Sequence, residues 1–162
     1  MAIHKLYIDE FDETDYRLVA IHTTLEDYRL AYFINRNLPV NLKKSNNDIQ
    51  IRSVLGENYF TRFTFEDKSR DNFWNLIQNK NSQTQTSSFT NSGLFSDTNT
   101  DFSTKVYLLP EYKNVDFFLK IENTDENFAI TNIVNQLKKI ERISTVYSLD
   151  AEKIKSKNNL IF

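Results

Sequence analysis

The sequence of 162 residues contains no cysteine and only two glycines and two prolines. Without cysteine the chain has no disulfide, no thiolate nucleophile and no cysteine-ligated metal or iron–sulfur centre. The P-loop and the dinucleotide-binding fingerprint each need several closely spaced glycines, so Gly56 and Gly93 alone exclude both motifs. The lack of disulfides is typical of a reducing compartment and favours the cytoplasm.

Long apolar runs and a strong net charge are also missing. No stretch approaches the ~20 apolar residues that cross a bilayer, and the first ten residues show no secretory signal pattern. The 20 Lys and Arg nearly balance the 22 Asp and Glu, so no global field attracts nucleic acid or anionic lipid. We therefore expect a soluble cytoplasmic protein that does not contact a membrane and for which nucleic acid is an unlikely partner.

The residues of common catalytic and metal sites are sparse or badly spaced. His4 and His22 are the two histidines, and neither belongs to a helical zinc-binding pair. No serine lies in a Gly-x-Ser-x-Gly elbow. The sequence therefore predicts no catalytic residue, no metal and no cofactor, and it favours a protein that is not an enzyme.

The hydrophobic pattern that is present predicts one α+β domain over residues 1–162, a length that can bury a substantial core. Apolar residues at helical spacing predict two helices, residues 25–38 and about 124–139, packed on a sheet of six to eight strands. Apolar runs and alternating patterns predict strands at residues 6–8, 18–22, 49–52, 59–66, 106–109, 115–121 and 143–149.

The connections between these elements predict a twisted, mostly antiparallel, mixed sheet. Residues 106–109 and 115–121 flank a turn that begins at Pro110, which is typical of a hairpin. The strand–helix–strand order of the last third predicts a crossover between parallel strands. Residues 82–103 are rich in Ser, Thr, Asn and Gln and predict a mobile loop. The apolar ending Leu160-Ile161-Phe162 should be docked on the domain, at a sheet edge or over the first helix.

Two acids beside the predicted hairpin are the candidate site. A tight turn would bring the carboxylates of Glu111 and Asp116 close together, where two acids shift each other's pKa or share a metal. This arrangement would suit a small-ligand or metal-binding protein or an enzyme, with Tyr112 as a neighbour. The alternative is structural, since Glu111 can accept hydrogen bonds from turn amides while Asp116 points outward.

A second face of the sheet also carries apolar side chains and must be covered. Phe118 shares the outward register of Asp116, and Trp74 lies in a segment with no purely polar face. Such a face is covered by a helix or by a partner. We therefore favour a non-catalytic protein-interaction or self-associating module, with Glu111, Tyr112, Asp116, Phe118 and Trp74 as binding residues.

Weak RNA binding is a further alternative. Basic residues are more frequent near the C-terminus, where they could contact the phosphates of RNA. They are Lys138, Lys139, Arg142, Lys153, Lys155 and Lys157. An ordinary solvated surface carries the same composition and is the favoured interpretation.

Residues 109–117, Leu-Pro-Glu-Tyr-Lys-Asn-Val-Asp-Phe, resemble the Ile-Pro-Glu-x-x-x-Val-Asp-Tyr signature of the bacterial IPExxxVDY family. The chain is similar to this family also at residues 4–6, at residues 25–32, at Trp74 and at residues 156–162. It departs from the signature at Leu109 and Phe117. The resemblance implies a bacterial protein but supplies no activity, cofactor or catalytic residue.

Overall fold

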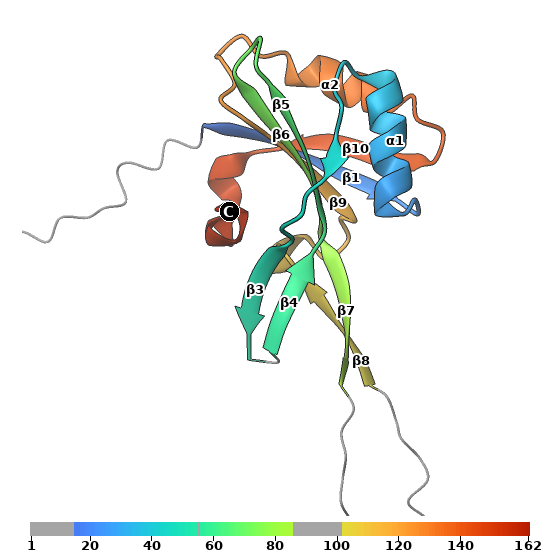
Figure 1. Cartoon of the computed structure of the whole chain (residues 1–162), viewed down its shortest axis with the longest axis vertical. Coiled ribbons are helices and arrows are strands. Elements are labelled where there is room, and N and C mark those ends of the chain that lie inside the picture. The colour runs from blue at the N-terminus through green and yellow to red at the C-terminus, as the bar shows by residue number, and fades with distance from the viewer. Residues whose placement is uncertain (1–14, 55, 86–101) are drawn as a thin grey trace, which may run out of the picture.

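The computed structural model describes residues 15–54, 56–85 and 102–162, which form an α+β fold with two α-helices on an antiparallel six-stranded sheet (Figure 1). The α-helices are α1 (Asp27–Asn37) and α2 (Ile130–Leu137). The strands are β1 (Tyr16–Thr23), β2 (Lys43–Lys44), β3 (Ile49–Ser53), β4 (Gly56–Phe60), β5 (Arg62–Asp67), β6 (Asn72–Gln78), β7 (Lys80–Gln85), β8 (Phe102–Tyr107), β9 (Phe117–Glu122) and β10 (Ile143–Leu149). Three 3-10 helices complete the described elements: η2 (Pro110–Tyr112), η3 (Ala151–Lys153) and η4 (Lys157–Leu160).

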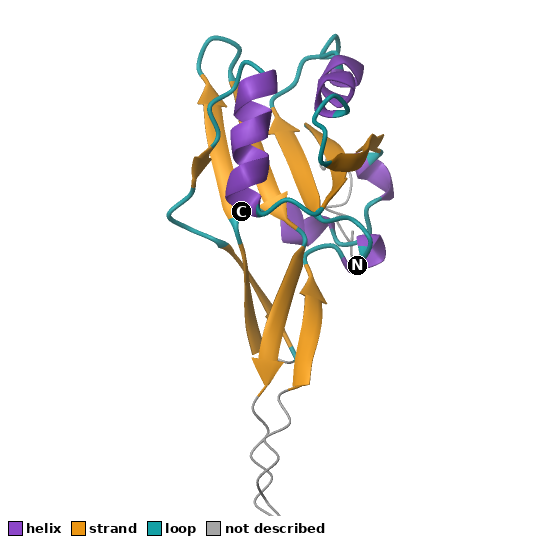
Figure 2. Cartoon of the chain, turned by 90° about the vertical axis from the view of Figure 1, so that its right-hand side faces the viewer, coloured by secondary structure: helices purple, strands orange, loops and turns teal. Residues whose placement is uncertain are grey.

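The large sheet has the strand order β10-β1-β9-β6-β5-β2. The hairpins β3–β4 and β7–β8 extend below this sheet and form two small sheets of their own (Figures 1 and 2). The four successive residues from Leu18 to Ile21 are fully buried, because β1 is central and both of its faces are covered. The prediction of a central strand at residues 18–22 is thus confirmed.

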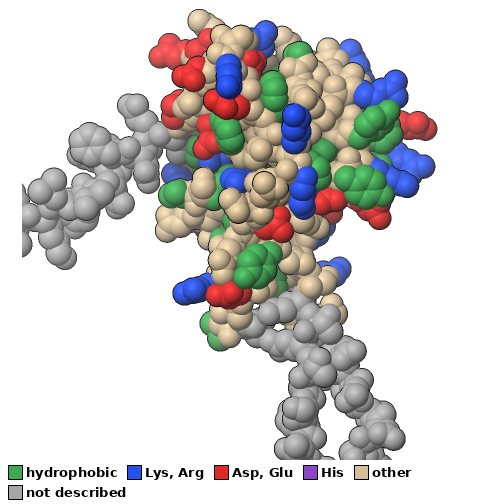
Figure 3. Space-filling view, in the orientation of Figure 1, with side chains coloured by type: hydrophobic (Ala, Val, Ile, Leu, Met, Phe, Trp, Pro, Cys, Tyr) green, Lys and Arg blue, Asp and Glu red, His purple; other side chains and the backbone are tan. Residues whose placement is uncertain are grey.

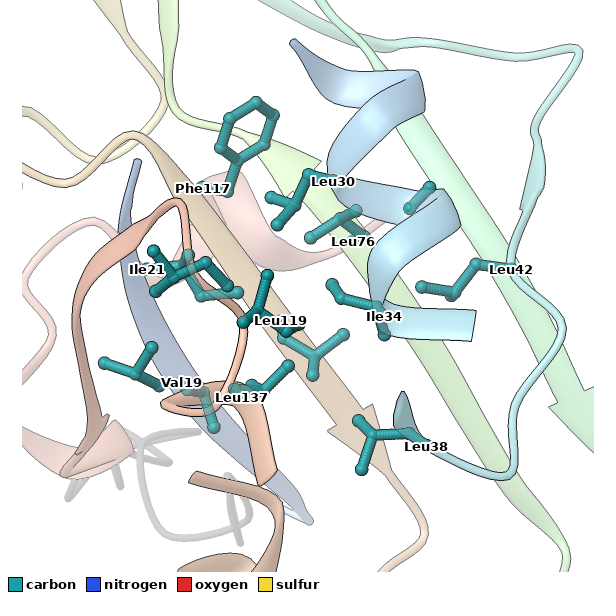
Figure 4. Packing of buried hydrophobic residues seen from close by; sticks show 14 of the residues in the cluster. Val19, Ile21, Leu30, Ile34, Leu38, Leu42, Leu76, Phe117, Leu119 and Leu137 are labelled. Carbon is teal, nitrogen blue, oxygen red and sulfur yellow. The ribbon is translucent and has the colours of Figure 1, made fainter. Parts of the chain in front are cut away.

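Both helices cover the first face of the sheet. Leu30 and Ile34 of α1 point toward the sheet residues Leu76 and Leu119, and Leu137 of α2 joins the same cluster (Figure 4). α1 begins two residues later than predicted, because Thr23 accepts a hydrogen bond from the amide of Leu25 before the helix starts. No described helix is long and apolar enough to cross a membrane.

The second face is covered by segments of the same chain, without an α-helix. Leu108, Leu109 and Val115 come from the connection between β8 and β9. Ile154 and Leu160 come from the segment after β10, and β3 and β4 add further apolar residues. This face therefore does not need a partner protein to exclude water from its apolar part.

The predicted hairpin between residues 106–109 and 115–121 is wrong. β8 pairs with β7, whereas β9 lies between β1 and β6. The connection between β8 and β9 contains η2, and the buried side chain of Asn79 holds this connection in place through hydrogen bonds. Its amide nitrogen donates to the carbonyls of Tyr112 and Val115, and its oxygen accepts from the amide of Leu109.

The predicted crossover exists, but its two strands are not neighbours. β9 and β10 both pair antiparallel with β1, which lies between them. Every pair of adjacent strands in the described sheets is consequently antiparallel, and the parallel pair of a mixed sheet is not formed.

The ends of the predicted mobile loop are paired strands. Ser82 lies opposite Lys105, and Thr84 lies opposite Ser103 in the β7–β8 ladder. Backbone hydrogen bonds form this ladder, so it does not require the apolar alternation that the sequence lacks there. The rest of that loop, residues 86–101, and the predicted strand at residues 6–8 lie outside the described residues.

The apolar ending is only partly buried. Leu160 is 1% exposed within the second-face cluster, whereas Ile161 is 74% exposed and Phe162 43%. The ring of Phe162 lies under the charged groups of Lys120 and Arg62, at 4.7 and 4.9 Å. The predicted position over the first helix is therefore wrong, because the segment lies on the opposite face of the sheet from α1.

Candidate functional site

Glu111 anchors the C-terminal segment. Its carboxylate accepts hydrogen bonds of 2.9 Å from the amides of Lys155 and Ser156 and from the hydroxyl of Ser156. Partial burial acts to raise the pKa of Glu111, but the hydrogen bonds from Ser156 and Lys155 outweigh it and lower the pKa from its ordinary value. This carboxylate is held in its charged form by structural donors.

Asp116 is bound by a different set of donors. Its carboxylate accepts a 2.9 Å hydrogen bond from the amide of Thr23 and forms a 2.7 Å ion pair with Lys80. It lines a hollow of about 400 Å³ at the start of α1, together with Lys80 and Gln78. Asp116 thus fixes the end of β1 and borders this hollow.

The hairpin that would bring the two carboxylates together is not formed, and the two acids bind different segments. Glu111 is bound to the segment after β10, whereas Asp116 is bound to the end of β1 and the start of β7. Among the described residues, no group of three or more His, Cys, Asp or Glu side chains could hold a metal ion.

The aromatic residues predicted to bind a partner are mostly covered. Trp74 and Phe118 are buried, so neither can contact a partner of the folded chain. Trp74 faces the α2 side of the sheet, where its ring meets Phe128 edge-on at 6.3 Å. Tyr112 is half-buried, and its ring stands edge-on to Phe118 at 6.2 Å. These residues stabilise the fold on both faces of the sheet.

The exposed aromatic residues lie instead on the outer side of α1. Tyr28 and Tyr32 are each 56% exposed and stand one helical turn apart. The guanidinium of Arg29 lies 5.9 Å from the centre of the Tyr28 ring, and that of Arg36 lies 5.8 Å from the centre of the Tyr32 ring. We call these four residues the α1 surface, and Figure 3 shows hydrophobic and basic side chains gathered over this helix.

The α1 surface stands on a rigid base. The opposite side of the helix buries Leu30 and Ile34 against the sheet. Asn35 clamps the chain beyond the helix, since its side chain donates to the carbonyl of Leu42 at 3.0 Å and accepts from the amide of Leu42 at 2.8 Å. The helix backbone that carries the exposed residues is therefore fixed on the domain.

The sequence did contain a signal for this surface. Tyr28, Tyr32 and Arg36 recur every four residues and so follow one side of a helix. This spacing places the three residues on one side of α1 but does not show whether other segments cover that side.

Comparison of the chain with known protein families, curated proteins and solved structures finds no match. Membership in the IPExxxVDY family stays a prediction, supported by the motif at residues 109–117.

Proposed function

We propose that the chain is a non-catalytic protein-interaction module that binds its partner through the α1 surface. One observation carries the proposal: two half-exposed tyrosines, each beneath an arginine, lie on a helix whose other side is buried in the core. Tyrosine and arginine are the residue types, with tryptophan, that dominate the binding energy of protein interfaces.

The chemistry of the α1 surface suggests what the partner presents. A tyrosine ring buries a large area with few rotatable bonds, and each of these rings lies within cation–π distance of a guanidinium. Less conformational entropy is then lost when a partner binds. Arg36 suits a carboxylate of the partner, which a guanidinium binds through two parallel hydrogen bonds, whereas Arg29 already forms a 3.9 Å ion pair with Glu26. We therefore expect a protein with shallow apolar pockets bordered by Asp or Glu.

The ligand-binding alternative is weaker than this proposal. The carboxylates of Glu111 and Asp116 are both engaged by donors that hold distant segments of the chain together. An enzyme or metal-binding protein that uses both acids would need them to meet. A ligand site that uses Asp116 without Glu111 could lie in the hollow beside Asp116, and this can be tested.

The RNA-binding alternative is weakened by the position of the basic residues. Lys138, Lys139 and Arg142 precede β10, and Lys153, Lys155 and Lys157 follow it. The seven residues of β10 span roughly 20 Å, so the two groups start from opposite ends of the strand. The cytoplasm as the location and a bacterial origin remain predictions from the sequence.

Photo-crosslinking tests the α1 surface directly. A benzophenone amino acid replaces Tyr32 in one variant and Tyr59, which is 49% exposed on β4, in a control variant. In cells of the source organism, the probe at position 32 should form an adduct with one discrete polypeptide, and the control should not. Adding Arg29→Glu and Arg36→Glu should abolish that adduct. Equal labelling from both positions, or none from position 32, would contradict the proposal.

A further inference from the structure

The two edges of the six-stranded sheet are protected very differently. At one edge, β2 has only two residues, and both are exposed lysines. At the other edge, β10 has seven residues, Ile-Ser-Thr-Val-Tyr-Ser-Leu, with no charge and no proline. Proteins normally shield edge strands by shortness, by lysine or by proline, because an open edge pairs with another strand. β2 is shielded in this way, whereas β10 is not.

The register of β1 shows which backbone groups of β10 face outward. The carbonyl of Asp15 accepts from the amide of Asn123, and the carbonyl of Ile21 accepts from the amide of Asp116, each at 3.1 Å. The odd-numbered residues from Asp15 to Ile21 therefore direct their backbone amide and carbonyl groups toward β9. Because alternate residues turn to alternate sides, Ala20 turns toward β10, where it lies opposite Tyr147.

The same alternation continues along β10. Tyr147 directs its amide and carbonyl toward β1, so Val146 and Ser148 direct theirs away from the sheet. Among the described strands, β10 has β1 as its only neighbour. The register shift between His22 and Thr23 leaves Ser144 as an extra residue at the start of β10, and Thr145–Leu149 remains regular.

We infer that β10 pairs with β10 of a second copy of this chain, antiparallel and centred on Val146, to join two sheets into one. In this register the outward amide and carbonyl of Val146 face the same groups of Val146 in the other copy. The outward backbone groups of Ser148 likewise face those of Ser144 in the other copy. A strand without charged residues allows two identical copies to approach with no like-charge repulsion between them.

The charges that flank β10 favour a second copy over an unrelated strand. The segment before β10 is basic, with Lys138, Lys139 and Arg142 against Glu141. The segment after it begins with Asp150 and Glu152 and continues with Lys153, Lys155 and Lys157, and Asp150 forms a 3.3 Å ion pair with Lys153. In the register centred on Val146, Arg142 of each copy lies opposite Asp150 of the other, twice by symmetry. The charges directly beside the strand are thus complementary to themselves.

This inference concerns a different surface from α1 and is tested on the purified chain alone. Sedimentation equilibrium of the wild type should give a concentration-dependent approach to twice the monomer mass of 19.2 kDa. The variant Thr145→Lys/Ser148→Lys puts two lysines on the exposed side chains of β10 and should stay monomeric. The control Thr24→Lys/Ser103→Lys adds the same charge at exposed positions outside β10 and should dimerise like the wild type.

Amide hydrogen exchange separates this dimer from any other. In the wild-type dimer the amides of Val146 and Ser148 should exchange slowly, and in the lysine variant they should exchange at least about tenfold faster. The amide of Tyr147, which bonds to β1, should stay protected in both and so reports that the variant is folded. Ser148→Pro removes one outward amide and provides a second monomeric variant if the lysines unfold the strand.

A charge exchange tests the antiparallel arrangement. Arg142→Glu should weaken the dimer by about fivefold, and adding Asp150→Arg in the same chain, which restores opposite charges at the facing positions, should recover it. A wild type that remains at 19.2 kDa, or a dimer that persists in both the lysine and the proline variants, would overturn the inference. So would protection of the Ser148 amide in a monomer, because another segment of the same chain would then occupy the edge.

Discussion

Glu111 and Ser156 are 45 residues apart in the sequence, yet two hydrogen bonds of 2.9 Å join the carboxylate of Glu111 to the amide and hydroxyl of Ser156. This contact fixes the segment that buries Ile154 and Leu160 against the second face of the sheet. The glutamate of the Leu-Pro-Glu motif therefore has a structural role, which is to hold the C-terminal segment over the core.

Glu111→Gln should destabilise the fold by about 1 to 1.5 kcal/mol. The amide loses the charge that strengthens the bonds from Lys155 and Ser156, but it keeps one oxygen acceptor. Urea unfolding measures the change, with Glu66→Gln on the exposed side of β5 as the matched control. An unchanged free energy of unfolding in Glu111→Gln would show that apolar burial alone holds the segment.

The contribution of Glu111 should depend on pH. Its pKa is lower in the folded chain than the ordinary value of 4.5, so the folded state binds fewer protons than the unfolded state near that pH. The stabilisation is complete above the unfolded pKa and is lost as the pH falls through the folded pKa. The difference in unfolding free energy between wild type and Glu111→Gln should therefore shrink as the pH falls below 4.5. A difference that grows on acidification would mean that the sign of the shift is wrong.

Asp116→Asn should cost no more than about 1.5 kcal/mol, because asparagine can still accept from the amide of Thr23 while the ion pair with Lys80 is lost. Thermal melts with divalent metals and a metabolite panel provide the readout, and Asp48→Asn is the control. We expect no ligand-dependent shift that requires Asp116. A variant that melts higher and loses such a shift would identify the hollow beside Asp116 as a ligand site.

Deleting residues 160–162 should lower stability by about 2 to 4 kcal/mol. The deletion removes the buried side chain of Leu160 and the carbonyl that accepts a 2.8 Å hydrogen bond from the buried ammonium of Lys120. Deleting only Ile161 and Phe162 should cost about 1 kcal/mol, since Ile161 is mostly exposed and Phe162 is half-buried against the cations of Lys120 and Arg62. Thermal unfolding compares the two truncated chains. An equal loss of stability in both would show that Leu160 does not contribute the larger part.

Local patterns in the sequence were enough to predict the elements that pack on one another regularly. Four successive apolar residues identified β1 as a central strand, and helical spacing located α1 and the end of α2. Tertiary contacts decided the rest. The buried amide of Asn79 redirects the chain between β8 and β9, and hydropathy assigns such a residue to the surface.

Two of the predicted binding residues, Trp74 and Phe118, are buried for a related reason. Their apolar side chains indicated a face that had to be covered, but not which segment would cover it. For Phe118 the cover comes from η2 and from the segment that Glu111 holds in place. The exposure of Tyr28 and Tyr32 likewise depends on which segments of the chain pack beside α1. The helical spacing of these residues in the sequence does not predict those segments.

The most direct test of the interaction proposal is the affinity of the polypeptide captured at position 32 for two matched tyrosine variants. Removing both rings of the α1 surface, in Tyr28→Ala/Tyr32→Ala, should weaken binding by at least about tenfold while leaving the melting temperature nearly unchanged. Tyr59→Ala, which removes a comparably exposed ring from β4, should bind like the wild type. Unchanged affinity in the double variant, or an equal loss in Tyr59→Ala, would contradict the assignment of the α1 surface as the binding site.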